Sequence, residues 1–135
     1  MAIKQLTVFV ENKRGRLAEI TGLLAENKID MSALSIADTK EFGILRLIVN
    51  DTDKALGILR DNGFLVQITE VVGLKVPDKA GELARALEVI DKAGINMEYL
   101  YAFISRDSSN AYIALRVADN PSAEKELINH GFEIL

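Results

Sequence analysis

The chain has 135 residues, of which 49% are hydrophobic and 27% charged, and its formal net charge at pH 7 is −4. It has no cysteine and a single histidine, which excludes disulfides, zinc–thiolate sites and thiol nucleophiles and leaves little scope for imidazole chemistry. The acidic balance argues against a nucleic-acid-binding protein, and no apolar stretch reaches the ~18 residues of a membrane span.

The first half of the chain predicts the order strand, helix, strand, strand, helix, strand. Apolar runs rich in β-branched and aromatic residues, which are typical of strands, span residues 6–10, 31–37 and 42–49. Gly15 opens a helix whose apolar residues recur at helical spacing: Leu17, Ile20 and Leu24. Asp51 is suited to cap a second helix, and Gly63 stands where a helix end favours a left-handed residue. A final strand follows.

Much of this pattern recurs later in the chain. Residues 15–18, Gly-Arg-Leu-Ala, are echoed by Gly-Glu-Leu-Ala at 81–84, and Ile-Asp-Met at 29–31 is echoed by Ile-Asn-Met at 95–97. Landmarks in the same order indicate a duplication. We therefore predict two domains, 1–69 and 70–135. The fold is then α+β, with two βαββαβ ferredoxin-like repeats whose antiparallel sheets carry their helices on one face.

The turn from the first strand into the first helix of each repeat is a candidate site. Gly15 and Gly81 begin these helices, where the first free backbone N–H groups form a socket for an anion such as a carboxylate. Lys13, Arg14 and Arg16 surround the first turn, although cations there oppose the helix dipole. A docked anion explains this cluster. The alternative is that these are solvated surface charges and the glycine serves only the turn.

A second candidate element is the start of the second strand of each repeat. Asp30 and Asn96 occupy equivalent positions there, each between an Ile and a Met. We expect them to lie close to the first-helix turn and to accept a hydrogen bond from an ammonium group. Turn and acceptor together suit a zwitterion, of which a free α-amino acid is the simplest. The alternative is that both residues only begin a strand, as turn residues do.

These two elements, found twice at the same internal spacing, resemble those of the ACT domain, a small-molecule-sensing module of amino-acid metabolism. The resemblance covers nearly the whole chain, as two ACT domains in tandem, and it implies allosteric binding of a free amino acid between paired domains. The ligand-binding positions that it implies are Asn12, Arg14, Gly15, Arg16, Leu17, Asp30 and Met31 in the first repeat, and Asp78, Ala80, Gly81, Glu82, Leu83, Asn96 and Met97 in the second. Arg14 and Ala80 stand where the family often has proline.

Four aromatic residues of the second repeat are expected on one open face of its sheet: Tyr99, Tyr101, Phe103 and Tyr112. Such a face can stack nucleic-acid bases, but the basic surround of RNA-recognition motifs is missing. A packed interface, against the other repeat or a second chain, is the favoured interpretation. We therefore expect a homodimer.

The sequence shows no phosphate-binding loop, nucleophile elbow, metal-ligand cluster or convergent acid–base set, so we expect neither an enzyme nor a bound cofactor or metal. The first interpretation is a non-catalytic sensor that binds a free amino acid at the interface of its tandem ACT-like domains and regulates amino-acid metabolism. The alternatives are a ligand-free interaction module that docks on a partner enzyme, and a pair of RNA-binding domains. Because no basic stretch and cleavage site follow Met1, we expect a cytoplasmic protein without membrane or nucleic-acid partners.

Overall fold

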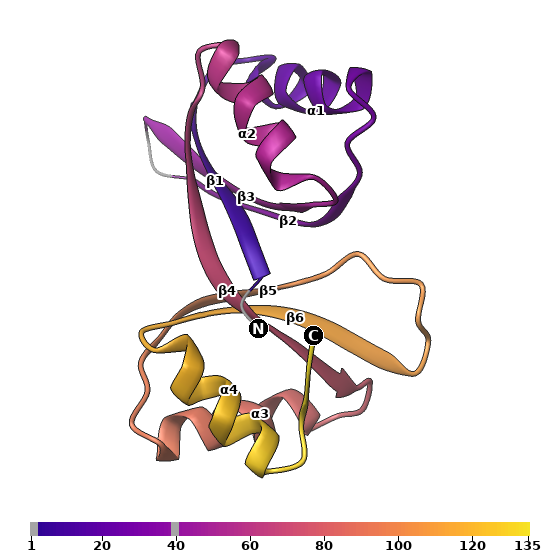
Figure 1. Cartoon of the computed structure of the whole chain (residues 1–135), viewed down its shortest axis with the longest axis vertical. Coiled ribbons are helices and arrows are strands. Elements are labelled where there is room, and N and C mark those ends of the chain that lie inside the picture. The colour runs from indigo at the N-terminus through magenta and orange to yellow at the C-terminus, as the bar shows by residue number, and fades with distance from the viewer. Residues whose placement is uncertain (1–2, 39–40) are drawn as a thin grey trace. The chain divides into compact units, whose positions relative to one another are not determined.

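The structure is a computed structural model that describes residues 3–38 and 41–135. Its internal contacts separate two compact units, an N-terminal unit of Lys4–Thr69 and a C-terminal unit of Glu70–Leu135 with Ile3. The strand β4 (Leu65–Pro77) contributes residues to both units. The predicted α+β fold, with the βαββαβ order twice, is confirmed (Figure 1).

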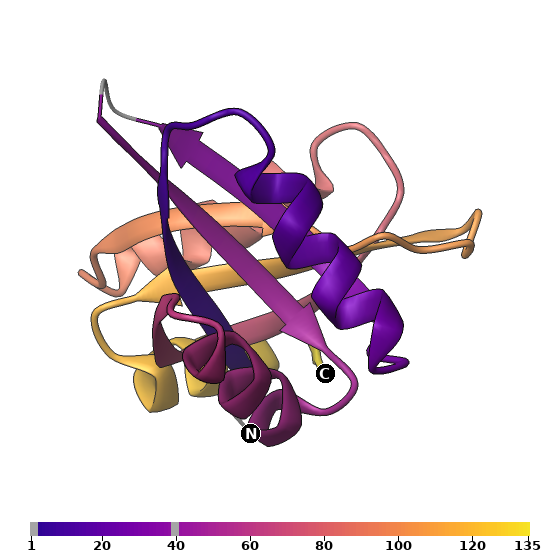
Figure 2. The same ribbon diagram turned by 90° about the horizontal axis from the view of Figure 1, so that it is seen from above.

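The N-terminal unit comprises β1 (Ile3–Glu11), α1 (Arg16–Glu26), β2 (Met31–Asp38), β3 (Phe42–Val49), α2 (Thr52–Asp61) and the first part of β4. Both β1 and β2 pair antiparallel with β3, and β1 also neighbours β4, which gives the strand order β2-β3-β1-β4. The helices α1 and α2 lie on the same face of this sheet (Figure 2).

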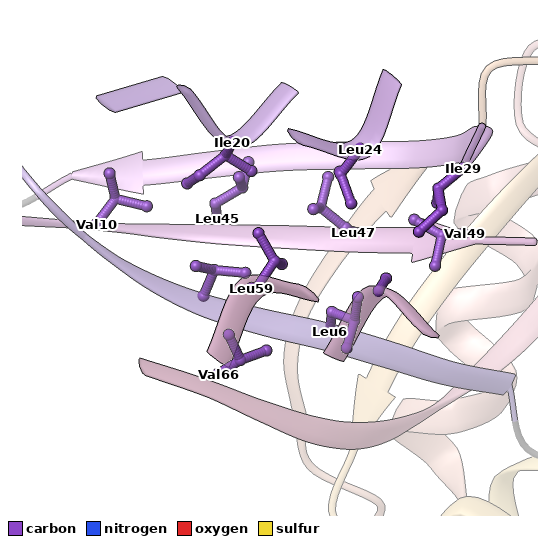
Figure 3. Packing of buried hydrophobic residues seen from close by; sticks show 12 residues of the cluster. Leu6, Val10, Ile20, Leu24, Ile29, Leu45, Leu47, Val49, Leu59 and Val66 are labelled. Carbon is purple, nitrogen blue, oxygen red and sulfur yellow. The ribbon is translucent and has the colours of Figure 1, made fainter. Parts of the chain in front are cut away.

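The apolar periodicity of the sequence builds the core of this unit. Ile20 and Leu24 of α1 and Leu59 of α2 are completely buried, and they point toward the strands in Figure 3. The sheet meets them with alternate residues of its strands, because side chains two apart in a strand share one face. These strand residues are Leu6, Val8, Val10, Leu45, Leu47, Val49 and Val66.

The C-terminal unit repeats this plan with the rest of β4, α3 (Glu82–Lys92), β5 (Met97–Ala102), β6 (Asn110–Val117), α4 (Asn120–Asn129) and β7 (Glu133–Ile134). The strand β6 pairs antiparallel with β4 and with β5, and β7 pairs with β4. Ala86 and Ile90 of α3 and Leu127 of α4 enter its core.

The predicted aromatic face of the second repeat is partly covered, because Tyr101 is buried and Tyr99, Phe103 and Tyr112 are half-buried. The ring of Tyr99 stacks on that of Tyr101, with centroids 6.5 Å apart and ring planes 24° apart. Tyr101 is only 8% exposed in the single chain. This ring is therefore no longer an argument for a second chain.

Candidate functional site

The first helix of each unit begins at a glycine without a side-chain cap. Gly15 precedes α1 with φ +88°, and Gly81 precedes α3 with φ +92°, both in the left-handed region that glycine adopts at little cost. The second helices differ, because Asp51 and Asp119 each accept a hydrogen bond from a backbone N–H of the first turn of α2 and α4. Of the four helices that the structure describes, α2 and α4 thus have a side-chain cap that accepts a hydrogen bond from a first-turn N–H group. In α1 and α3 no described side chain caps the first turn, so its N–H groups can donate to a ligand.

Backbone hydrogen bonds hold the two glycine turns in the same way. In the first, the N–H of Asn12 donates to the carbonyl of Glu41 at 3.1 Å, and that of Arg16 donates to the carbonyl of Lys13 at 3.4 Å. The equivalent bonds of the second turn are Asp78 to Ser109 at 2.9 Å and Glu82 to Lys79 at 3.3 Å. The duplication thus extends to the detailed geometry of the turns.

A cavity of about 220 Å³ lies beside the start of α1 in the N-terminal unit. Its lining combines two predicted residues, Asn12 and Leu17, with residues from the far end of β2 and the start of β3. The full set is Val10, Glu11, Asn12, Leu17, Ile36, Asp38 and Gly43. Aliphatic side chains form part of the wall, and two carboxylates and an amide supply its polar groups.

Strand register explains why Asp38 and Ile36 belong to this cavity. Gly43 of β3 pairs with Val10 of β1 on one side and with Asp38 of β2 on the other. The carboxyl end of β2 is therefore level with the end of β1, where the turn into α1 begins. We did not predict Asp38 as a site residue. The signal that identifies it is the β2–β3 register.

The cations of the first turn are partly neutralised by neighbouring carboxylates. Lys13 Nζ lies 2.9 Å from Glu11 Oε2, and Arg16 Nη2 lies 3.9 Å from the same atom. The hydrogen bond and charge of Lys13, with a smaller effect of Arg16, hold the pKa of Glu11 below its ordinary value. Arg16 also pairs with Glu19 at 3.0 Å. Arg14 is exposed. The turn therefore carries a mixed cluster rather than the purely basic one that the sequence suggested.

Asp30 does not lie beside the Gly15 turn of its own unit. Its backbone N–H donates to Asn50 Oδ1 at 3.0 Å, and the N–H of Asn50 donates back to the Asp30 carbonyl at 3.1 Å. Between Gly15 and Asp30 runs the whole of α1, whose 11 residues span about 16 Å at 1.5 Å per residue. The expectation of proximity is wrong within one unit, because Gly15 precedes α1 and Asp30 follows it, at opposite ends of the helix.

The C-terminal unit shows the same separation. Asn96 accepts a backbone hydrogen bond from Ala118 at 3.0 Å and lines a cavity of about 470 Å³ together with Gly94 and Ser122, beyond the carboxyl end of α3. Gly81 begins the other end of that helix, after the exposed Ala80. Three further predicted residues pack against the hydrophobic cores: Met31, Leu83 and Met97.

No group of three or more His, Asp or Glu side chains suited to a metal ion occurs among residues 3–38 and 41–135. None of the helices described is both long and apolar enough to cross a bilayer.

The comparisons with known proteins agree with the fold. The family model of the ACT domain pair matches residues 1–132. The crystal structure of protein BT0572 from Bacteroides thetaiotaomicron is 41% identical, with a TM-score of 0.94 over 100% of this chain and 92% of that one. The ligand-free regulatory subunit of aspartate kinase from Thermus thermophilus is 12% identical, with a TM-score of 0.69 over 95% of this chain and 92% of that one.

The corresponding subunit from Thermus flavus is 13% identical, with a TM-score of 0.66 over 93% of this chain and 90% of that one. Likeness at this level of identity concerns the fold alone. No curated protein matches the sequence. The resemblance inferred from the two glycine turns is confirmed by the family match, and the chain belongs to the ACT domain pair family.

Proposed function

We propose that this protein is a non-catalytic regulatory module that binds a free amino acid beside the start of α1. The cavity of about 220 Å³ at that turn is the observation that carries the proposal. Pockets for drug-sized molecules hold roughly 300–1,000 Å³, so this one suits a smaller ligand. The shared fold of the aspartate kinase regulatory subunits supports a regulatory role, with an enzyme of amino-acid metabolism as the partner.

The groups around the cavity suit the parts of an amino acid with an apolar side chain. Its carboxylate would accept hydrogen bonds from the uncapped first turn of α1, with Arg16 adding positive charge. Its side chain would contact Val10, Leu17 and Ile36. The carboxylate of Asp38, on the same cavity, favours the ammonium group over a neutral substituent.

We further propose that a second copy of the chain completes the site with its Asp30. Among the described strands β2 pairs with β3 alone, and its Leu34 and Ile36 are 43% and 49% exposed. An apolar strand edge of this kind is a template for pairing with another chain. Antiparallel pairing of two β2 edges would bring the start of each β2, with Asp30, next to the end of the other, where the cavity lies. A homodimer would then unite the two predicted elements that one unit separates.

A thermal-shift screen of the full chain against the twenty amino acids tests the proposal. A ligand at about 100 times its Kd stabilises the fold by about 2.7 kcal/mol, which corresponds to a rise of roughly 10 °C in Tm for a chain of this length. We expect this rise for at least one amino acid with an apolar side chain. No stabilisation by any amino acid at millimolar concentration would overturn the proposal and favour the ligand-free docking module.

Sedimentation of edge variants tests the dimer. The variant Leu34→Lys places a charge on the exposed edge of β2, away from the residues that line the cavity, and we expect a monomer with weakened binding. Ile128→Lys is the matched control, because Ile128 is also an exposed aliphatic residue but lies on α4. It should leave both the dimer and the binding unchanged. A wild-type chain that sediments only at ~15 kDa at micromolar concentrations would contradict the dimer.

A further inference from the structure

The ion pair on the first helix is reversed between the two repeats. In α1, Arg16 holds the first helical position, and its Nη1 lies 3.0 Å from Oε2 of Glu19, three residues on. In α3, Glu82 holds the first position, and its Oε2 lies 3.1 Å from Nη2 of Arg85, again three residues on. The pair and its spacing are kept, and only the order of the charges differs.

The arginine of each pair nevertheless packs on an equivalent aromatic ring. The guanidinium carbon of Arg16 lies 6.0 Å from the centroid of Phe64, and that of Arg85 lies 4.1 Å from the centroid of Phe132. Each of these phenylalanines follows the left-handed glycine after the second helix of its repeat. The arginine–ring contact thus exists in both orders. The packing does not require the reversal, but the charge at the helix start changes sign.

The sign of that charge decides how well the turn accepts an anion. The first turn of a helix carries a partial positive charge. At its first position, Arg16 reinforces this charge, although Glu11 and Glu19 partly neutralise the guanidinium, and Glu82 opposes it, although Arg85 partly neutralises the carboxylate. At the start of α3, the carboxylate of Glu82 already complements the helix dipole, and it repels a second carboxylate that approaches the same N–H groups. A ligand carboxylate is therefore favoured at Gly15 and disfavoured at Gly81, although the two turns have the same backbone geometry.

The N-terminal unit has a cavity at its glycine turn. The cavity of about 220 Å³ in the N-terminal unit is lined by Asn12 and Leu17, on either side of Gly15. Neither of two cavities of the C-terminal unit is lined by residues 78–84, around Gly81. The one of about 510 Å³ is lined by Arg85 of the ion pair, by further residues of α3 and α4 and by His130. The one of about 470 Å³ lies beyond the carboxyl end of α3.

We infer that the N-terminal repeat alone binds the amino acid, one molecule per chain, and that the order of the ion pair on the first helix selects the binding repeat. The inference rests on the proposed function, because it assigns that ligand to one of two otherwise equivalent turns. The C-terminal repeat then keeps the fold of a binding domain without its ligand.

Exchanging the charges within each pair tests the inference. R16E/E19R gives α1 the order of α3, and E82R/R85E gives α3 the order of α1, so that each variant retains an ion pair. The probes are the twenty amino acids, each tested separately on the full chain by thermal shift, followed by calorimetry with those that stabilise it. We expect the wild-type chain to bind one molecule. We expect R16E/E19R to bind at least tenfold more weakly than wild type. We expect E82R/R85E to bind with an affinity within twofold of wild type, or to gain a second site.

The outcomes separate this inference from the proposed function. A wild-type chain that none of the amino acids stabilises overturns both. Two molecules per wild-type chain, wild-type affinity in R16E/E19R, or loss of binding in E82R/R85E overturns the selection by the ion pair and leaves the proposed function standing. Melting curves without ligand show whether each variant folds. If a swap does not fold, a single substitution that removes only the first charge of the pair replaces it. We expect R16Q to weaken binding and E82Q to leave binding unchanged.

Discussion

The hydroxyl of Tyr112 donates a hydrogen bond of 2.7 Å to Oδ2 of Asp107. The same carboxylate accepts bonds from the backbone N–H groups of Ser109, at 2.8 Å, and Asn110, at 3.3 Å. The Tyr112 bond, followed by the backbone bond of Ser109 and a bond of 3.1 Å from the side-chain amide of Asn110 to Oδ2, lowers the pKa of Asp107 to about 2. One ionised side chain thus ties together the hairpin between β5 and β6.

The low pKa of Asp107 predicts that the hairpin loses stability in acid. A carboxyl group whose pKa is lower in the folded than in the unfolded chain stabilises the fold above its unfolded value near 3.8, and this contribution disappears as the pH falls toward 2. We expect Asp107→Asn to flatten the fall in unfolding free energy between pH 5 and pH 2, as measured by urea denaturation. Tyr112→Phe, which removes the strongest donor, should flatten it partly. Identical pH profiles for Asp107→Asn and wild type would contradict the prediction.

Replacing the aspartate cap of either second helix by alanine is predicted to lower the free energy of unfolding. Asp51 Oδ1 accepts the N–H of Lys54 at 3.2 Å, and Asp119 Oδ1 accepts that of Ser122 at 3.1 Å. Removing such a cap costs about 1 kcal/mol, within a range of roughly 0.5–2. We expect this loss for Asp51→Ala and Asp119→Ala in urea denaturation at pH 7. Asp53 lies in the first turn of α2 but does not cap the helix, so Asp53→Ala should lower the free energy of unfolding by less. An equal loss for Asp53→Ala and Asp51→Ala would count against the capping role.

The left-handed turn before α1 predicts opposite effects for two Gly→Ala substitutions. A Cβ at Gly15 meets no heavy atom within 4 Å, but its φ of +88° costs an L-residue roughly 1–2 kcal/mol. Gly57 is exposed inside α2, and a Cβ there also meets nothing within 4 Å. Alanine is favoured over glycine in a helix by about 1 kcal/mol. We therefore expect Gly15→Ala to lower Tm and Gly57→Ala to raise it, and a rise for both would exclude strain at Gly15.

The fold could be predicted because its signals are local and occur twice. Glycines at the helix starts, an aspartate cap and an alternating strand pattern each constrain the backbone nearby, and the repeat showed that two sets of them belong to equivalent units. The family resemblance rested on the same turns, as in Gly15 and Gly81 with their matching left-handed φ angles. These properties depend on sequence neighbours alone.

The composition of the site depended on distances that sequence spacing does not give. Asp30 follows Gly15 by only 15 positions, but most of them form a helix that carries the chain to the far end of the sheet. Asp38, which lines the cavity, is further along the sequence and returns to the turn through the pairing of β2 with β3. Which end of each element meets which loop follows from the strand order. The alternation of β5 likewise indicated a packed face but not that Tyr101 is buried within a single chain.

The proposed dimer makes a final prediction about mixed variants. If each site takes its helix turn from one copy and Asp30 from the other, R16E/E19R and Asp30→Leu damage different halves of the same site. We expect the Asp30→Leu chain to fold, because the Asp30 side chain is exposed. Both hydrogen bonds between residue 30 and Asn50 use the backbone of residue 30, so the substitution keeps them. A charge-assisted hydrogen bond of the kind lost is worth roughly 1.5–3 kcal/mol, so binding by the Asp30→Leu homodimer should fall about ten- to a hundredfold.

A heterodimer of the two variants restores one intact site. The Asp30→Leu chain supplies an unaltered Gly15 turn with Arg16, and the R16E/E19R chain supplies an unaltered Asp30. We expect a mixed dimer, purified through two different tags, to bind one amino acid with wild-type affinity, whereas both parent homodimers bind weakly or not at all in calorimetry. Two wild-type chains carrying the same tags are the control and should bind two molecules. A heterodimer as weak as its parents, or an Asp30→Leu homodimer with wild-type affinity, would mean that each chain holds its ligand without help from the second.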